Sequence, residues 1–505
     1  MTMTAARTTG RPSRRTFRGT VGLLGACALL LGACTAPRTH YPSAAAPDTR
    51  TLPPVSPELR GYYGQQLRWE PCQQAPSFQC TTMKVPLDYS HPRTGDILLG
   101  VTRKKATGAG TARIGSLQFN PGGPGEPAMS RLWAISGSFS SSVRAAYDLV
   151  ALDPRGVGHS TPVRCDPALP AGGGTGIDAW DAAFRQAAAT CARQAGRLLP
   201  HVGTVEAARD MDVLRALLGD ERLHFFGYSY GTYLGSTYAG LFPARVGRMV
   251  LDGAVDPDLS GYQALLESNA ARQAAWERFA ADCVERGHCA LGNSVREAGR
   301  ALDTLRIALD RTPLRQGKDL TITGDEMIDA VTSALSAPAW KQLRTALRGV
   351  LDGDTTAVQQ LAHTGQDTNG ALLAIGCLSA ALNPRFTAAQ ATAALPNFLH
   401  AAPQFGASTA VLLMACTHWP VGPTQPVQPV TAPGAAPILV VGTAGDPVTP
   451  LSWARTVAHR LSSGRLLIYD GNGHTAYHHG STCIDTSVDR YLVRGQLPPA
   501  EAVCS

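Results

Sequence analysis

The pattern of hydrophobic positions divides the chain into a strand-rich part and a helical part that interrupts it. Apolar runs of four to six residues, typical of buried parallel strands, occur at 97–102, 114–119, 148–152, 223–226, 249–252, 438–441 and 466–469. Between residues 258 and 410, stretches rich in Ala, Leu and Arg predict helices and show few strand signals. We therefore predict an α/β fold with a mostly parallel central sheet, formed by 58–257 and 411–505, and an all-helical cap inserted at 258–410.

One helix of the α/β part has clear end signals. Residues 204–218 carry an apolar stripe at helical spacing. Thr204 suits the N-cap, where its hydroxyl would accept a backbone N–H, and Gly219 suits the C′ position, where a left-handed backbone ends a helix. The pattern predicts a helix over 204–218, between two strands.

A tight turn joins the strand at 223–226 to a helix predicted over 232–242, and it has the sequence Gly-Tyr-Ser-Tyr-Gly from Gly227 to Gly231. A serine on such a strand-to-helix turn is forced outward, and glycines flank it because the turn is strained. The spacing predicts that Ser229 is a nucleophile. The alternative is a glycine-rich loop that carries a solvated serine.

Two further candidate residues follow predicted strands near the C-terminus. Asp446 comes after the run 438–441, and His474 comes after the run 466–469. Because the carboxyl ends of parallel strands meet at one edge of a sheet, we expect both side chains to lie near Ser229. In this arrangement the serine attacks, the histidine removes its proton and the aspartate holds the imidazole.

Other polar residues near strand ends receive different interpretations. Asp470 is an alternative acid, but it lies too near His474 in the sequence to be its usual orienting partner. In the loop after the strand at 148–152, Asp153 and Arg155 are expected to hold the turn rather than to act in catalysis.

The loop after the strand at 114–119 is a candidate oxyanion hole. It reads Asn-Pro-Gly-Gly-Pro-Gly over residues 120–125, so its backbone N–H groups are not obstructed by side chains. The amide of Gly123, or that of Gly122, would join the amide of Tyr230 in facing a developing oxyanion.

Six separated segments together resemble one known family. The segments 120–125, 153–162, 227–235, 251–257, 445–450 and 473–474 are similar, in order, to the secreted bacterial tripeptidyl aminopeptidases. These enzymes are relatives of proline iminopeptidase within the α/β-hydrolase fold, and the resemblance runs from about Leu67 to the C-terminus. It implies the α/β-hydrolase fold, a triad of Ser229, Asp446 and His474, and release of short peptides from free N-termini through an acyl-enzyme.

The chain departs from that family at two places. Glu126 follows the glycine loop where family members often have further small residues, and Leu378 and Ser379 follow Cys377 where they commonly carry an acid. In those enzymes, that acid would bind the N-terminal ammonium group of the substrate, and its absence here leaves the aminopeptidase specificity open. An esterase or lipase-like hydrolase with the same triad therefore remains an alternative, and so does a catalytically retired binding protein on this fold.

The N-terminus predicts export. Residues 1–18 carry five arginines and no acid, and the apolar core at 21–33 is too short for a permanent membrane span. The twin arginines Arg14 and Arg15 resemble a twin-arginine signal, and Leu-Gly-Ala-Cys at 31–34 resembles a lipobox. We predict a signal peptide at 1–33, a lipid anchor on Cys34 and a flexible tether at 34–57, which places the protein outside the cell or on the outer face of the cytoplasmic membrane. Cys27 is an alternative lipidation site, and a cleaved signal without lipid is a further one.

The net charge of +7 is mainly a property of this signal. Without residues 1–33, 40 basic and 38 acidic residues remain, a net charge of +2. Nothing in this balance indicates a nucleic-acid partner. The sequence has no phosphate-binding loop and no zinc-site spacing, so we expect a monomer that acts on peptides without a cofactor or metal.

Cysteine usage agrees with export. Apart from Cys27 and Cys34, ten cysteines remain, and an even number fits complete disulfide pairing in an oxidising compartment: Cys72, Cys80, Cys165, Cys191, Cys283, Cys289, Cys377, Cys416, Cys483 and Cys504. Pairing of nearest neighbours gives five plausible short clasps, although the sequence leaves the connectivity open. A bond between Cys377 and Cys416 would tie the helical insertion to the core.

Overall fold

A computed structural model describes residues 55–108, 110–165, 176–316, 320–362, 369–379, 384–423 and 430–505. The predicted signal peptide, almost all of the tether and the two candidate lipidation sites, Cys27 and Cys34, lie outside these described residues. Within them, no helix is both long and apolar enough to cross a membrane.

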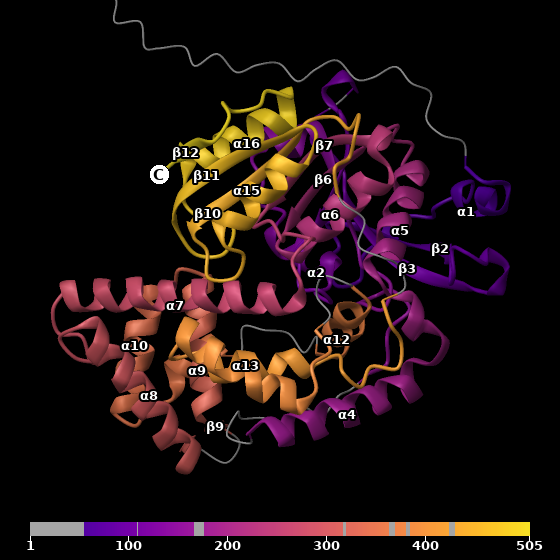
Figure 1. Cartoon of the computed structure of the whole chain (residues 1–505). Helices are drawn as coiled ribbons and strands as arrows, with labels where there is room; N and C mark the ends of the chain where they lie inside the picture. The colour runs from indigo at the N-terminus through magenta and orange to yellow at the C-terminus, as the bar shows by residue number, and fades with distance from the viewer. Residues whose placement is uncertain are drawn as a thin grey trace, which may run out of the picture. The chain divides into compact units, whose positions relative to one another are not determined.

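A ten-stranded sheet runs through the described chain in the order β1-β2-β3-β5-β4-β6-β7-β10-β11-β12 (Figure 1). Its strands are β1 (Glu70–Pro71), β2 (Gln79–Pro86), β3 (Asp96–Lys104), β4 (Gly115–Asn120), β5 (Tyr147–Leu152), β6 (Leu223–Tyr228), β7 (Val246–Asp252), β10 (Ile438–Gly445), β11 (Gly464–Asn472) and β12 (Ala502–Cys504). Neighbours from β5 to β12 are parallel, and the strands from β1 to β5 pair antiparallel. All seven predicted strands are confirmed. Strands β1, β2 and β12 were not predicted. In β2, exposed Thr82 and Lys84 alternate with buried Met83 and Val85, so it has no continuous apolar run like those of the predicted strands.

Helices cover both faces of the sheet. On one face lie α5 (Thr204–Leu217), α6 (Tyr230–Leu241) and α15 (Leu451–Arg460), and on the other lie α2 (Ala128–Ile135), α3 (Ser141–Ala146) and α16 (Thr482–Arg494). Successive residues of β6 point into the hydrophobic cores on opposite faces of the sheet: Phe225 packs on the face covered by α5, α6 and α15, and Phe226 on the face covered by α2, α3 and α16. Burial on both faces explains why the central strands are continuous apolar runs in the sequence.

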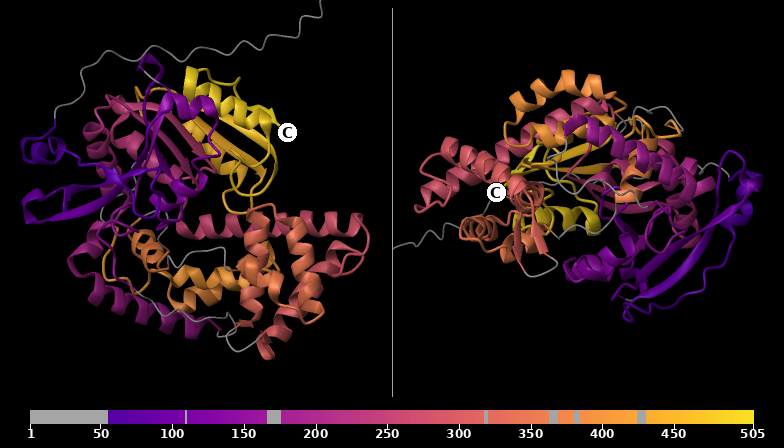
Figure 2. Two further views of the ribbon diagram at one scale, coloured as in Figure 1. Left: turned by 180° about the vertical axis from the view of Figure 1, so that it is seen from behind. Right: turned by 90° about the horizontal axis from the view of Figure 1, so that it is seen from below.

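The segment between β7 and β10 forms the cap, which lies beside one end of the sheet in both Figure 1 and Figure 2. Its helices are α7 (Gly261–Glu285), α8 (Val295–Arg311), α9 (Gly324–Ser336), α10 (Trp340–Leu351), α11 (Thr356–Ala362), α12 (Asn369–Leu378), α13 (Ala388–Ala401), α14 (Gly406–Ala410) and the 3-10 turn η8 (Val411–Met414). Trp276, Phe279, Leu302 and Leu347 belong to a core of its own.

Two features of this region differ from the prediction. The cap is not all helical, because β8 (Leu314–Gln316) and β9 (Leu320–Ile322) form an antiparallel pair, too short to leave a strand pattern in the sequence. In addition, α4 (Gly176–Ala195) packs against α13 and η8, although it precedes the nucleophile turn in the sequence (Figure 1). The cap therefore includes a helix from the first part of the chain.

The predicted helix 204–218 is confirmed as α5, but its N-cap is not. Gly203 occupies the N-cap and Thr204 is the first helical residue. The Thr204 hydroxyl instead lies 2.7 Å from the Tyr230 hydroxyl and 2.9 Å from the Ser379 hydroxyl, so tertiary partners replace the local cap. Gly219 has φ +76° just past the helix, as predicted for C′.

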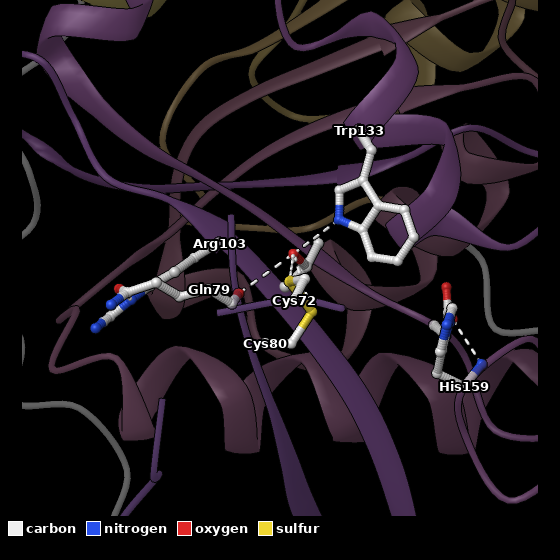
Figure 3. Close-up of a disulfide and its surroundings, with 8 residues drawn as sticks. Cys72, Gln79, Cys80, Arg103, Trp133 and His159 are labelled. Atoms are coloured by element: carbon white, nitrogen blue, oxygen red, sulfur yellow. Dashed lines mark hydrogen bonds and ion pairs between the residues drawn. A yellow bond between two sulfur atoms is a disulfide. The ribbon is translucent and has the colours of Figure 1, made fainter. Parts of the chain in front are cut away.

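Five disulfides join the ten cysteines, each to its neighbour in the sequence: Cys72–Cys80, Cys165–Cys191, Cys283–Cys289, Cys377–Cys416 and Cys483–Cys504. The first clasps β1 to β2 at the edge of the sheet (Figure 3). Beneath it, the buried Thr102 hydroxyl lies 3.4 Å from the Cys72 sulfur and accepts a hydrogen bond from the Trp133 indole at 3.0 Å. Disulfides in this number are typical of proteins in oxidising compartments.

Candidate active site

Ser229 lies on a strained turn between β6 and α6. Its backbone has φ 53° and ψ −123°, a conformation that non-glycine residues rarely adopt. Its N–H donates to the carbonyl oxygen of Asp252 at 2.9 Å, which ties the turn to the end of β7. This is the geometry that a nucleophile turn requires, with the hydroxyl at the carboxyl edge of the sheet.

The two flanking glycines are required by close packing. A Cβ on Gly227 would lie 2.6 Å from the carbonyl oxygen of Gly231, across the turn. A Cβ on Gly231 would lie 2.8 Å from both the carbonyl and the side-chain oxygen of Asn120. Only hydrogen fits at either position, because real Cβ atoms do not approach other atoms so closely.

Asp446 is the carboxylate that contacts His474. It is 3% exposed, and its oxygens lie 2.9 and 3.0 Å from Nδ1 of His474. The same carboxylate accepts hydrogen bonds from the amides of Val448 and Thr449, each at 2.8 Å, and from the Thr449 hydroxyl at 2.9 Å. These bonds fix the carboxylate and therefore the orientation of the imidazole. The alternative acid, Asp470, is exposed.

The other ring nitrogen of His474, Nε2, is buried and has no hydrogen-bond partner among the described residues. Burial lowers the pKa of this imidazole, but the charge of Asp446, its hydrogen bond to Nδ1 and the charge of Asp252 raise it, and the net shift is upward. An imidazole with a carboxylate at Nδ1 and an open Nε2 is equipped to take a proton from a nearby hydroxyl.

The glycine loop after β4 lies directly against the serine. A Cβ on Gly122 would meet Cβ of Ser229 at 2.9 Å, and both Gly122 and Gly123 have positive φ. The Gly122 amide already donates to the side chain of Asn120 at 3.0 Å. Gly123 and Tyr230, the latter in the first turn of α6 where amides lack intrahelical acceptors, therefore carry the better candidate amides for an oxyanion hole.

A pocket of about 300 Å³ opens beside the serine. Ser229, Tyr230 and Gly123 form one wall, and side chains of the cap and of the segment after β10 form the others, among them Leu265, Leu372, Leu412, Val448 and Trp453. The Cys377–Cys416 disulfide also lines it. Among these lining residues Asp256 is the only one with a charged side chain; it is 6% exposed, and burial raises its pKa against the lowering effect of Arg460.

The residues that depart from the family pattern after Cys377 lie away from this pocket. Leu378 and Ser379 are buried and do not line it. The Ser379 hydroxyl lies 2.9 Å from that of Thr204, which in turn lies 2.7 Å from the Tyr230 hydroxyl. Ser379 thus belongs to the packing behind the nucleophile turn.

The loop after β5 has the structural contacts expected of it. Asp153 accepts hydrogen bonds from the amides of Met129 and His159, each at 2.8 Å. Arg155 is fully buried and its guanidinium pairs with Asp210 at 2.7 Å through two nitrogens. The turn is therefore tied to α2 and to α5.

Cap residues also hold the loops that carry Asp446 and His474, and the sequence did not indicate these residues. Arg278 of α7 donates to Oδ1 of Asn472 at 2.8 Å and to the carbonyl of Gly445 at 3.1 Å. The His474 amide donates to the carbonyl of Ser336, at the end of α9, at 2.8 Å. Asp252 and Asp256 were part of a motif, 251–257, that carried the resemblance, but no role was deduced for either.

Comparisons with known proteins agree with this geometry. The chain is 33% identical over 489 residues to the serine protease Hip1 of Mycobacterium tuberculosis, a match that covers 87% of this chain and 91% of that protein. It is 32% identical over 472 residues to the tripeptidyl aminopeptidase of Streptomyces lividans, covering 86% of each. It is also 33% identical over 463 residues to carboxylesterase B of Mycobacterium tuberculosis, covering 85% and 86%. Residues 402–504 match the family described as TAP-like protein.

Proposed function

Since this chain belongs to the tripeptidyl-aminopeptidase-like family of serine hydrolases with the α/β-hydrolase fold, we propose that it is an exported exopeptidase that releases short peptides from free N-termini. The observation that carries the proposal is the His474–Asp446 pair. Its loop is joined to the Ser229 turn through Asp252, and Ser229 lines a largely apolar pocket. The names of two relatives, a serine protease and a tripeptidyl aminopeptidase, support a peptidase.

The proposed mechanism uses three side chains and two amides. Ser229 Oγ attacks the scissile carbonyl while Nε2 of His474 takes its proton, and Asp446 stabilises the imidazolium. The amides of Gly123 and Tyr230 receive the developing oxyanion. The imidazolium then protonates the leaving amine, which departs and leaves an acyl-enzyme. Water, deprotonated by His474, hydrolyses the ester and regenerates the serine.

The pocket supports a substrate class. Leucine and tryptophan side chains on its walls favour an apolar residue next to the scissile bond. Asp256, its single charged lining residue, supplies a buried carboxylate that would compensate the ammonium group of a free N-terminus. Its Oδ1 lies 4.0 Å from the Arg460 guanidinium and accepts the amide of Asp258 at 3.1 Å. We propose that Oδ2, for which the described residues show no hydrogen bond, receives the substrate ammonium group.

Export is proposed from two independent features. The basic, apolar N-terminus has the composition of a signal peptide, and the described chain contains five disulfides. Anchoring through acylated Cys34 and a monomeric state remain predictions. Mass spectrometry of the mature N-terminus from a producing cell tests the first, and sedimentation tests the second.

A serine-directed phosphonate provides the primary test. We expect stoichiometric labelling of the wild-type protein on Ser229, identified by peptide mapping, and none for Ser229→Ala. Tripeptide anilides with a free N-terminus should be cleaved, and the same anilides with an acetylated N-terminus should be cleaved far more slowly. An unlabelled wild-type protein would indicate a catalytically retired binding protein.

A second candidate function is ester hydrolysis. The apolar pocket accommodates an acyl chain as well as a peptide side chain, and one relative is named a carboxylesterase. Turnover of p-nitrophenyl acyl esters without any cleavage of the free tripeptide anilides would favour this function. Replacement Asp256→Asn separates the two further, because it should raise KM for free N-terminal peptides and leave ester hydrolysis unchanged.

A further inference from the structure

Asp252, the last residue of β7, contacts both halves of the candidate catalytic apparatus. Its carbonyl oxygen accepts the amide of Ser229 at 2.9 Å. Its carboxylate accepts the amide of Ala476 at 3.0 and 3.1 Å and the amide of Tyr477 at 2.8 Å. One residue therefore joins the turn of the nucleophile to the histidine loop, which we define as residues 473–479.

The histidine loop has a backbone that needs such support. Thr475 has φ 70° and His478 has φ 64°, and residues with side chains adopt this region only when their surroundings hold them there. The amides that donate to Asp252, those of Ala476 and Tyr477, lie between these two positions. Without these hydrogen bonds, we expect the loop to relax toward ordinary backbone angles, which would displace the imidazole of His474.

The Asp252 side chain is costly to bury, which favours a role beyond packing. It is 0% exposed, and burial raises its pKa to about 6 although the two backbone amides and the charges of His479 and His474 oppose this shift. A buried carboxylate is retained only where hydrogen bonds or nearby charges compensate its burial, and here the compensating groups belong to the histidine loop. Its negative charge also acts on His474, whose pKa it helps to raise.

We propose that Asp252 is a positioning residue of the active site: it holds the histidine loop and the nucleophile turn in register, and its charge supports the imidazolium that forms on His474. This role rests on the proposed serine-hydrolase function. Asp252 does not touch the reacting atoms, and it acts through His474 and the backbone of Ser229.

The test compares Asp252→Asn with a matched control, Asp485→Asn. Asp485 also accepts an amide of the histidine loop, that of His478 at 2.8 Å, but it is not among the groups that act on the His474 pKa. The readouts are the rate constant for phosphonate labelling of Ser229, the pH dependence of that rate, and the thermal unfolding temperature of each full-length protein.

For Asp252→Asn we expect a folded protein whose labelling rate falls about 10- to 100-fold, since small displacements of a catalytic group have effects of this size. The acidic limb of its pH profile should move to lower pH, because loss of a negative charge lowers the pKa of His474. Among the described residues, the other titratable groups that act on Asp252 or are acted on by it are His479 on the histidine loop and Tyr228 on β6. Neither group can supply the negative charge that Asp252→Asn removes. For Asp485→Asn, the acidic limb should lie at the same pH as in the wild-type protein, and the labelling rate should stay within about threefold of the wild-type rate.

Failure of the positioning role and failure of the proposed function give different results in this experiment. Wild-type labelling on Ser229 together with an unchanged rate and limb in Asp252→Asn would overturn the positioning role and leave the proposed function intact. A lower rate with an unshifted limb in Asp252→Asn would reduce Asp252 to a structural residue. Absence of labelling on wild-type Ser229 would overturn the proposed function, and the positioning role with it.

Two further measurements apply if Asp252→Asn does not fold. Asp252→Ser is smaller and keeps one acceptor, and it should show the same displaced limb. In the wild-type protein, hydrogen exchange should be slow at the amides of Ala476 and Tyr477. Rapid exchange there would overturn the proposal, since it would mean that the carboxylate does not hold the loop.

Discussion

The two ring nitrogens of His474 have different surroundings, and this difference defines the chemistry proposed for it. Nδ1 is paired with a carboxylate that four other groups hold in place, whereas Nε2 is buried without a partner among the described residues. The sequence favoured Asp446 because Asp470 lies too near His474 along the chain to be its usual orienting partner. The structure adds the reason, because Asp446 is buried beside the ring and Asp470 is exposed.

Replacement of Asp446 by Asn should lower kcat by about 10³- to 10⁴-fold, because an amide favours the wrong tautomer of His474. Steady-state turnover of a free tripeptide anilide measures the effect. Asp470→Asn is the matched control and should retain wild-type turnover. The opposite result, with activity lost only in Asp470→Asn, would contradict the assignment of the acid.

Activity should decline as the pH falls, since only the neutral imidazole of His474 accepts the serine proton. The pKa of His474 is raised above its usual 6.5, chiefly by Asp446 against the effect of burial. The acidic limb of kcat/KM should therefore have its midpoint above pH 6.5 and reach a plateau at higher pH. A midpoint well below 6.5 would show that the imidazole does not meet this carboxylate in solution.

Strand β6, the turn and helix α6 form one tightly packed unit with the end of β4. Gly231 stands in the first turn of α6, where a methyl group would meet the backbone and side chain of Asn120. The sequence identified this unit because glycines at fixed positions around a serine, between a strand and a helix, are typical of a nucleophile turn. It did not show that Asn120 is the neighbour that excludes a side chain, since that contact joins residues far apart in the sequence.

Gly231→Ala should destabilise the protein and displace the oxyanion loop, and we expect turnover to fall at least tenfold. Gly240→Ala, in the same helix, is the matched control: a Cβ there meets nothing within 4 Å, so the change should stabilise the protein by up to about 1 kcal/mol. Urea unfolding and turnover measure both variants. Equal stability of the two would argue against close packing of Gly231 on Asn120.

The cap and the α/β core meet directly at the loops that carry Asp446 and His474. Arg278 bridges the ends of β10 and β11, and the end of α9 accepts the amide of His474. The pocket wall combines α7, α12 and the segment after η8 with the core. The cap therefore lines the pocket and also holds the loops that carry Asp446 and His474.

Arg278→Ala should lower kcat/KM several-fold, because the loops that carry Asp446 and His474 lose a contact with the cap. The free energy of unfolding should fall by about 1–3 kcal/mol, because two acceptors are left without their donor. Arg286→Ala, just past the end of the same helix, breaks an exposed ion pair with Asp282 and should leave kcat/KM unchanged. The comparison uses turnover and urea unfolding. Equal changes in kcat/KM and in the free energy of unfolding for the two variants would contradict a role of Arg278 in holding these loops.

The disulfides should differ in their contribution according to the loops that they close. Cys377–Cys416 spans 39 residues and Cys283–Cys289 spans 6, so chain entropy predicts stabilisation of about 4 and about 2 kcal/mol respectively. Paired Cys→Ala variants, followed by urea unfolding, test this order. Only loss of Cys377–Cys416 should also raise KM, because that bond lines the pocket.

By itself the sequence determined the parallel strands, the nucleophile turn, the order of the candidate catalytic residues and the even set of cysteines. These depend on local backbone preferences and on strand order, which neighbouring residues encode. The tertiary structure alone decided that Thr204 faces Tyr230 instead of capping its helix, that α4 joins the cap, that Asp256 enters the pocket and that Asp252 holds the histidine loop. Each of these is a contact between segments distant in the chain, and its energy exists only after the chain has folded.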